Sequence, residues 1–210
     1  MHMYFEKVAK EWDSNSRKER AKILASTILD KLGDTKDLIA LEIGCGTGLL
    51  TFELNEYFFK IYCADTSIEM LSVLEDKIKN TNTKNIYAFS EDLLGNKEYY
   101  QTFDVIYSSM VFHHINDIRK ELQLLHNLLK KDGIFIIIDL DKEDGRFHKL
   151  EEDFCGHNGF DRNELQLIIE ESKFSDVSFK TVYTGEKEIE DDIIPYSLFL
   201  CSAKGACLKH

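Results

Sequence analysis

Short apolar runs alternate with segments of helical periodicity along most of the chain. Five runs predict strands, at residues 38–43, 60–64, 86–89, 103–108 and 134–138. Between several of these runs, apolar residues recur every three or four positions, the spacing of an amphipathic helix. Strands and helices that alternate in this way form parallel sheets through right-handed crossovers. The pattern therefore predicts a doubly wound α/β sheet with helices on both faces.

The expected helices begin at residues that can cap them. Ser16 and Glu19 form a capping box before one helix, and Thr66 and Glu69 form another after the second strand. Asp161 stands in the corresponding place before a late helix. These signals place the first helix before the first strand.

The last third of the chain departs from the alternation. Residues 177–183 and 196–203 read as two strands with no helix between them, which pair most simply as an antiparallel hairpin. Their connection, GEKEIEDD at 185–192, is acidic, and the sole proline, Pro195, precedes the final strand. We therefore expect a mostly parallel, seven-stranded sheet that ends in an antiparallel hairpin. No repeat or low-complexity linker interrupts residues 1–210, which predicts a single domain.

The charge balance disfavours nucleic acid as a partner. The chain has 38 acidic and 26 basic residues, a net charge of -12, whereas proteins that neutralise phosphates carry a basic patch. The one basic cluster comprises Arg17, Lys18, Arg20 and Lys22. Because it alternates with Glu19, we interpret it as a solvated helix face.

Cysteine use and the chain start favour the cytoplasm. Five cysteines without a CxxC pair argue against a disulfide framework or a zinc knuckle. The first residues, MHMYFEKVAKEW, are charged throughout and lack the apolar core of a signal peptide. The longest aliphatic run, 134–138, is too short to span a membrane. The abundance of Lys, Ile and Asn is typical of an AT-rich bacterial genome.

Three of the 11 glycines stand together in LEIGCGTGLLT, directly after the first predicted strand. In open α/β sheets, ligands bind beyond the carboxyl ends of strands, and glycine lets the backbone approach them closely. A phosphate-binding GxxxxGK[ST] loop is absent, and the dinucleotide pattern GxGxxG fails because position 49 is Leu49. The pattern that remains is E-x-G-x-G-x-G.

This pattern resembles motif I of the class I S-adenosylmethionine-dependent methyltransferases. Asp65 ends the second predicted strand, 19 residues after Gly46, and the family uses a carboxylate there to bind both ribose hydroxyls. Asp92, in SEDLL, matches the acid that the family often places beside the adenine amino group. The resemblance implies a Rossmann-like fold and a set of cofactor-binding residues. That set is Glu42, Gly44, Cys45, Gly46, Gly48, Asp65, Thr66, Asp92, Leu93 and Ser108.

Two further stretches extend the resemblance to roughly residues 4–140. FDVIYSSMVFHHI, at 103–115, is similar to the cofactor- and substrate-lining loop of the ubiquinone- and menaquinone-biosynthesis subset. YFEKVAKEWD resembles the aromatic cap that closes over the cofactor in that subset. The implied division is an N-terminal helical cap (1–35), a cofactor-binding core (36–140), and a substrate-side loop, helix and hairpin (141–210).

The implied activity is methyl transfer from S-adenosylmethionine to a small-molecule acceptor by in-line displacement, leaving S-adenosylhomocysteine. The sulfonium makes this transfer favourable without a metal, so no metal is expected. Glu42 either orients the glycine loop or binds near the ammonium of the cofactor. Two alternatives stay open: a non-catalytic domain that binds the same cofactor, and an NAD(P)-dependent oxidoreductase of Rossmann type.

Three histidines are candidates for a general base, which an oxygen, nitrogen or acidic carbon acceptor can require. His113 and His114 follow the fourth predicted strand, where a substrate should enter. Neighbouring side chains point in different directions, so at most one of the two should face the site. His157 lies between Gly156 and Gly159, which predicts a shaped loop at the same rim. Each of the three can instead position a substrate or support a turn.

Overall fold

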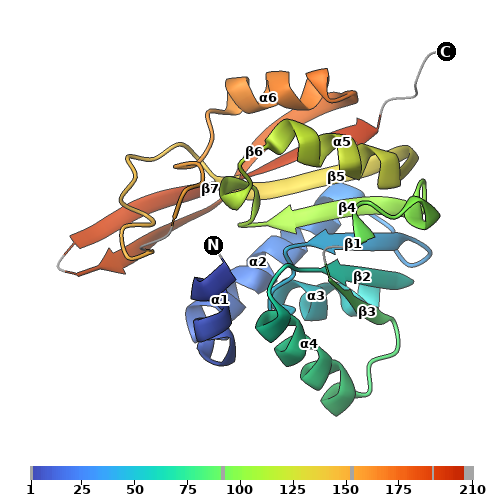
Figure 1. The fold of residues 1–210 in the computed structure, drawn as a ribbon. Helices are drawn as coiled ribbons and strands as arrows, with labels where there is room; N and C mark the ends of the chain where they lie inside the picture. Colours follow the sequence, from blue (N-terminus) through green and yellow to red (C-terminus); the bar gives the residue numbers. More distant parts are fainter. Residues whose placement is uncertain (1, 91–92, 152–153, 191, 206–210) are drawn as a thin grey trace.

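The computed structural model describes residues 2–90, 93–151, 154–190 and 192–205 (Figure 1). Its strands are β1 (Ile39–Ile43), β2 (Lys60–Ala64), β3 (Ile86–Phe89), β4 (Phe103–Ser109), β5 (Leu129–Leu140), β6 (Phe174–Ile189) and β7 (Asp192–Gly205). They form one seven-stranded sheet in the order β3-β2-β1-β4-β5-β7-β6. Strands β1 to β5 pair in parallel, and β7 runs antiparallel to both β5 and β6. The predicted architecture is confirmed.

Helices cover both faces of this sheet (Figure 1). They are α1 (His2–Val8), α2 (Asn15–Leu32), α3 (Leu49–Leu54), α4 (Ile68–Thr81), α5 (Ile118–Leu128) and α6 (Arg162–Glu171). Short 3-10 turns are η1 (Ala9–Glu11), η2 (Asn55–Tyr57), η4 (Lys97–Tyr99) and η5 (Phe112–His114). No described helix combines the length and the apolar character needed to cross a membrane.

The apolar runs of the central strands serve two separate cores. In β1, Leu41 and Ile43 belong to a cluster with buried residues of α5 and α6. Ala40, directly before Leu41, belongs to a second cluster with α2, α3 and α4. Successive side chains of a strand point to opposite faces, so a strand covered on both faces needs apolar residues at consecutive positions. This explains why these strands read as unbroken apolar runs rather than alternating ones.

Two helix starts differ from the prediction by one or two residues. Helix α2 is capped by Ser14, whose Oγ accepts a hydrogen bond from the amide of Arg17 at 3.3 Å, and not by Ser16. Helix α4 is capped by Ser67 and not by Thr66. Adjacent hydroxyl residues are equivalent candidates in sequence, and the backbone path selects one. At α4 this choice leaves Thr66 on the wall of a pocket.

The C-terminal hairpin is longer than predicted. Pairing continues to Ile189 and Asp192, so most of the acidic segment 185–192 is strand and not connection. Pro195 pairs with Glu186 of β6, while the described pairing of β5 with β7 starts only at Leu198. At Pro195 strand β7 is therefore paired on one side only, the kind of position in a sheet at which proline is found. The distal half of the hairpin projects beyond the sheet as a two-stranded arm (Figure 1).

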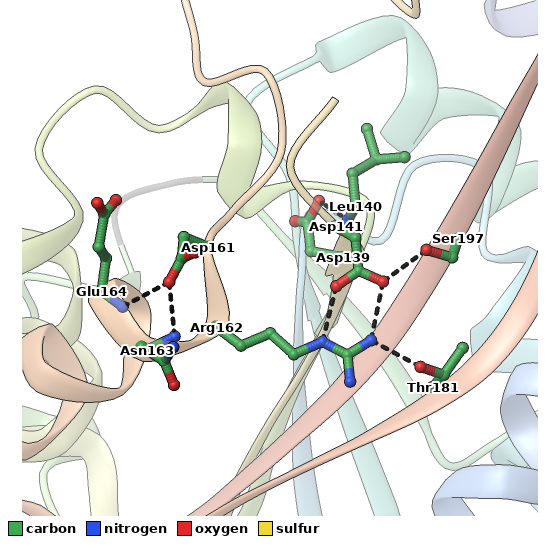
Figure 2. A network of polar contacts seen from close by, with 9 residues as sticks. All are labelled: Asp139, Leu140, Asp141, Asp161, Arg162, Asn163, Glu164, Thr181 and Ser197. Atoms are coloured by element: carbon green, nitrogen blue, oxygen red, sulfur yellow. Dashed lines mark hydrogen bonds and ion pairs between the residues drawn. The ribbon is translucent and has the colours of Figure 1, made fainter. Parts of the chain in front are cut away.

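An ion pair joins Asp141, directly after β5, to Arg162, the first residue of α6, and both strands of the hairpin hydrogen-bond to it (Figure 2). Arg162 donates from Nε to Oδ1 of Asp141 at 2.7 Å and from a terminal nitrogen to Oδ2 at 2.8 Å. Ser197 of β7 donates to the same carboxylate at 2.6 Å, and Thr181 of β6 accepts from Arg162 at 2.7 Å. Partial burial acts to raise the pKa of Asp141, but the bonds from Arg162 and Ser197 hold it below its usual value. The two ends of segment 141–161 are thereby fixed to the sheet.

Replacing the cap of α6 should destabilise the protein measurably. Asp161 accepts from the amides of Asn163 and Glu164 at 2.9 and 3.1 Å, as the sequence predicted (Figure 2). Asp161→Ala should lower the free energy of unfolding by about 1 kcal/mol, measured by urea denaturation. The matched control Asp37→Ala, at an exposed position, should change it by less than about 0.5 kcal/mol. Equal effects of the two variants would contradict the assignment of the cap.

Candidate functional site

A pocket opens at the carboxyl ends of β1, β2 and β4, where the strand order reverses about β1. Such a switch point is the usual ligand site of open α/β sheets. Its wall includes six of the predicted cofactor residues, namely Glu42, Gly44, Cys45, Gly46, Asp65 and Thr66. Six of the ten predicted cofactor residues thus share one pocket, and their contact with a cofactor stays a prediction.

The other predicted cofactor residues support this wall from behind or lie elsewhere. Ser108 is buried and donates its hydroxyl to the carbonyl of Ile43 at 3.0 Å. Leu93 packs in the apolar core beside α5. Gly48 precedes α3 in the left-handed conformation and faces α4. Asp92 falls outside the described residues, so its predicted contact with adenine stays a prediction.

The three glycines have two different roles. A Cβ on Gly44 would lie 2.2 Å from a methyl of Val111, and one on Gly48 would lie 2.5 Å from a methyl of Leu74. Those two glycines permit close packing of the protein against itself. A Cβ on Gly46 would meet no atom nearer than 3.9 Å, although its φ of +53° is also left-handed. Gly46 is therefore the glycine whose open face belongs to the pocket.

Asp65 holds the glycine loop against the start of α4. Its Oδ2 accepts from the amide of Gly46 at 2.7 Å, and its Oδ1 accepts from the amide of Ser67 at 2.9 Å. Burial raises the pKa of the carboxyl, and the two amide bonds counteract part of that rise. Each oxygen retains a second lone pair. The carboxylate can thus keep both backbone bonds and still accept from two hydroxyls of a ligand.

Glu42 is buried beneath the loop and has an unusual protonation equilibrium. Its Oε2 accepts from the hydroxyls of Thr51 at 2.6 Å and Tyr107 at 3.0 Å. Burial raises its pKa to about 7, although both hydroxyl bonds favour the ionised form. Near neutral pH the side chain is consequently divided between carboxyl and carboxylate. A cation bound in the pocket would shift this balance to the carboxylate.

The N-terminal segment closes one side of the pocket. Phe5 and Trp12 line it, in agreement with the aromatic cap expected from the sequence. Asp13 accepts from the hydroxyl of Thr47 in the glycine loop at 2.6 Å and pairs with Lys77 of α4 at 2.5 Å. These contacts attach the cap to the loop that it covers.

The interpretation of the basic cluster as a solvated face is wrong for two of its four members. Arg17 and Arg20 are half-buried and line the pocket, whereas Lys18 and Lys22 are exposed. Burial, and then the charge of Arg20, lower the pKa of Arg17. The signal in the sequence was helical spacing, because Arg17 and Arg20 lie four positions before the buried Ala21 and Leu24, respectively.

The candidate bases occupy three different environments. His114 lines the pocket with its ring centroid 5.3 Å from that of Phe5, and burial, then His113, lower its pKa to about 3. His113 is fully buried behind it, with Nδ1 2.5 Å from Oδ1 of Asp139. The expectation that at most one of the pair faces the site agrees with this arrangement. His157 donates from Nε2 to the carbonyl of Ile115 at 3.0 Å and lies outside the pocket lining.

A further histidine, which the sequence places on the substrate side after the fifth predicted strand, joins this group. His148, from the segment after β5, is 4% exposed and has its ring 4.8 Å from that of His113 and 5.4 Å from that of His114. Burial, and then His113 and His114, lower its pKa to about 2. His148 lies 34 positions after His114, so the sequence gives no sign that the two rings meet.

The fold and the site define a nucleotide-type pocket on a Rossmann-like sheet, and comparison with known proteins assigns the family. A family model described as a methyltransferase domain matches residues 14–180. The chain belongs to this methyltransferase family.

The individual relatives carry different activities in their names. Malonyl-[acyl-carrier protein] O-methyltransferase of Bacillus anthracis is 30% identical over 75% of this chain and 62% of its own length. A human mitochondrial arginine hydroxylase is 36% identical over 47% of this chain and 27% of its own. The chain therefore spans less than two thirds of these curated relatives.

Among solved structures, phosphoethanolamine N-methyltransferase 2 of Haemonchus contortus, in complex with S-adenosyl-L-methionine, has the same fold. It matches with a TM-score of 0.71 at 15% identity, over 88% of this chain and 52% of that one.

The different roles of the glycines can be tested by stability. Gly46→Ala should fold and lose about 1–2 kcal/mol of unfolding free energy, the cost of a left-handed conformation with a Cβ. Gly44→Ala should lose that amount and about 1–3 kcal/mol more, because its Cβ clashes with Val111. Urea denaturation of both variants measures the difference. Equal losses would show that the open face of Gly46 is not open in solution.

Proposed function

We propose that the protein is an S-adenosylmethionine-dependent methyltransferase that acts on a small-molecule acceptor by in-line displacement and leaves S-adenosylhomocysteine. The observation that carries this proposal is the convergence of the open face of Gly46, the carboxylate of Asp65 and the aromatic cap on one pocket. The family assignment and the structural similarity to a methyltransferase bound to this cofactor support it.

The residues of the pocket match the chemical groups of this cofactor. Asp65 can accept from both ribose hydroxyls while it keeps its backbone bonds. Glu42 can face the ammonium, and the guanidiniums of Arg17 and Arg20 can pair with the carboxylate of the amino-acid part. Bound S-adenosylmethionine supplies a methyl group activated by a sulfonium. The protein then has to align the acceptor with the methyl group and exclude water. Alignment alone can lower the activation free energy by several kcal/mol.

His114 suits a positioning role better than that of a general base. An effective base has a pKa near the working pH, whereas the pKa of His114 is about 3. At neutral pH its imidazole is uncharged, so it can donate or accept a hydrogen bond at the pocket wall. His113 lies behind this wall and His157 outside it. We therefore assign the side of the pocket formed by His114 to the acceptor.

A reducing cytoplasm is the compartment that we propose for the protein. The structure describes Cys45, Cys63, Cys155 and Cys201, all as free thiols, of which Cys155 is exposed. An exposed free thiol persists best where glutathione and thioredoxin keep cysteines reduced. The composition typical of an AT-rich genome favours a bacterial source.

Titration calorimetry with S-adenosylmethionine, S-adenosylhomocysteine and NADH tests the cofactor directly. We expect binding of the first two and none of NADH. Asp65→Ala should weaken S-adenosylmethionine binding by about 1–3 kcal/mol, because ribose hydroxyls lose their acceptor. The matched control Asp76→Ala, on the exposed side of α4, should bind as the parent protein does. Binding of NADH alone, or equal affinity of both variants, would overturn the proposal.

The raised pKa of Glu42 predicts a pH-dependent affinity. A glutamate with a pKa of about 7 is mostly protonated at lower pH, and an ammonium beside it favours the ionised form. Affinity for S-adenosylmethionine should therefore rise between about pH 5.5 and pH 7. If binding lowers the pKa of Glu42 by one unit, the affinity should rise by up to about tenfold over this range. In Glu42→Gln this rise should disappear. A rise that persists in that variant would assign the titration to another group.

A further inference from the structure

Three histidines from two segments form a buried cluster at the edge of the pocket. His113 and His114 belong to η5, and His148 comes from the segment between β5 and α6. One ring nitrogen of each lies within 4.8 Å of the other two. The three side chains are 1%, 8% and 4% exposed, respectively. Histidines that are merely packed in a core normally direct their nitrogens toward separate partners.

Two of these rings have a buried nitrogen without a hydrogen-bond partner. In the part of the chain that the structure describes, these atoms are Nδ1 of His114 and Nδ1 of His148. A buried polar atom left unpaired costs about 1–3 kcal/mol. Two such atoms in one cluster therefore indicate that a partner is missing from the polypeptide itself.

The third ring is oriented as metal-binding histidines are. Nδ1 of His113 lies 2.5 Å from Oδ1 of Asp139, a fully buried carboxylate at the end of β5. Asp139 also accepts from the amides of Leu140 at 2.7 Å and His113 at 3.3 Å, so its position is fixed. A carboxylate that accepts from one nitrogen of a histidine fixes its tautomer and leaves the other nitrogen as a ligand.

The chain on both sides of the cluster is held in place. His148 stacks on Phe154 with 3.9 Å between ring centroids and 4° between planes. The amide of His157 donates to the carbonyl of His113 at 2.6 Å, and a Cβ on Gly156 would lie 2.0 Å from that oxygen. The bidentate pair of Asp141 and Arg162 fixes both ends of the same segment (Figure 2). The glycines that sequence analysis marked as shaping this loop thus bring it onto η5.

We propose that His113, His114 and His148 bind one divalent transition-metal ion, for which Zn²⁺ is the probe. Three imidazoles with an open fourth position are a donor set that zinc takes in catalytic sites. Zinc–nitrogen bonds of about 2.1 Å place tetrahedral ligands about 3.4 Å apart, so nitrogens now within 4.8 Å have to approach by up to about 1.4 Å. Rotation of the imidazole rings can provide that approach. This inference departs from the expectation of no metal that the sequence suggested.

The charges around the cluster are compatible with an ion. Ligating nitrogens must be unprotonated, and Nδ1 of His114 and Nδ1 of His148 have no hydrogen-bond partner among the described residues. Asp139 supplies the nearest carboxylate, and burial raises the pKa of Glu151, a second acid close by. Lys187 is the neighbouring cation, and burial lowers its pKa. Since His114 lines the pocket, an open coordination position of the metal would face the acceptor side. That the metal would act on the acceptor rests on the proposed methyltransferase function, whereas the metal site itself does not.

Metal titration of the untagged, chelator-treated protein tests the proposal. We expect one Zn²⁺ per chain by calorimetry, and the visible absorption of tetrahedral Co²⁺ when cobalt replaces zinc. His148→Phe keeps an aromatic ring on Phe154 and should lose more than about tenfold in zinc affinity, as should His114→Phe. The matched control His126→Gln, on α5, should retain the parent affinity. Circular dichroism confirms that each variant is folded.

The outcomes separate the metal site from the proposed enzyme activity. S-adenosylmethionine is titrated into the same metal-free samples, so the two bindings are read independently. Absence of zinc binding by the parent protein, or an affinity that survives both His148→Phe and His114→Phe, would overturn the metal site whatever the cofactor result. Zinc binding without S-adenosylmethionine binding would support the site and contradict the proposed function.

Discussion

The carboxylate of Asp65 is the contact on which the pocket depends. It accepts from an amide of the glycine loop and from an amide at the start of α4, and so joins the ends of β1 and β2. Left-handed glycines alone permit many loop paths, because φ > 0 costs glycine almost nothing. The two hydrogen bonds select one path, in which Gly46 turns its open side to the pocket. The same bonds fix the acid on the wall of the pocket, where we propose that it accepts from ribose hydroxyls.

Much of this arrangement could be predicted because its causes are local. Apolar runs covered on both faces predict the parallel strands, and a glycine loop with an acid at the next strand end predicts the pocket. Arg17 and Arg20 were misinterpreted because charge alternation along a helix does not say what covers the helix. The length of the hairpin was missed because an acidic strand with a proline looks like a loop when it has a partner on one side only.

The histidine cluster could not be predicted from local sequence. His113 and His114 follow β4, but their relation to His148 depends on a segment that a distant ion pair and close glycine contacts bring back to the sheet. Those contacts join residues far apart in sequence, so neither periodicity nor spacing predicts them. Sequence reasoning therefore found more of the residues around the glycine loop than of those around the histidine cluster. Local motifs build the first, and tertiary contacts build the second.

The free pocket keeps its buried titratable groups close to neutrality. Glu42 is about half protonated near pH 7, and the imidazoles of His114 and His148 are uncharged. Glu42 is buried with an ionisable group, and Nδ1 of His114 and Nδ1 of His148 are buried without a partner among the described residues; natural proteins tolerate such costs mainly at functional sites. A positively charged group beside Glu42 would offset the first cost, and a metal ion bound by the imidazoles would offset the second. The buried groups of the free protein thus indicate the ligands that we propose: a cationic group beside Glu42, and a metal ion at His114 and His148.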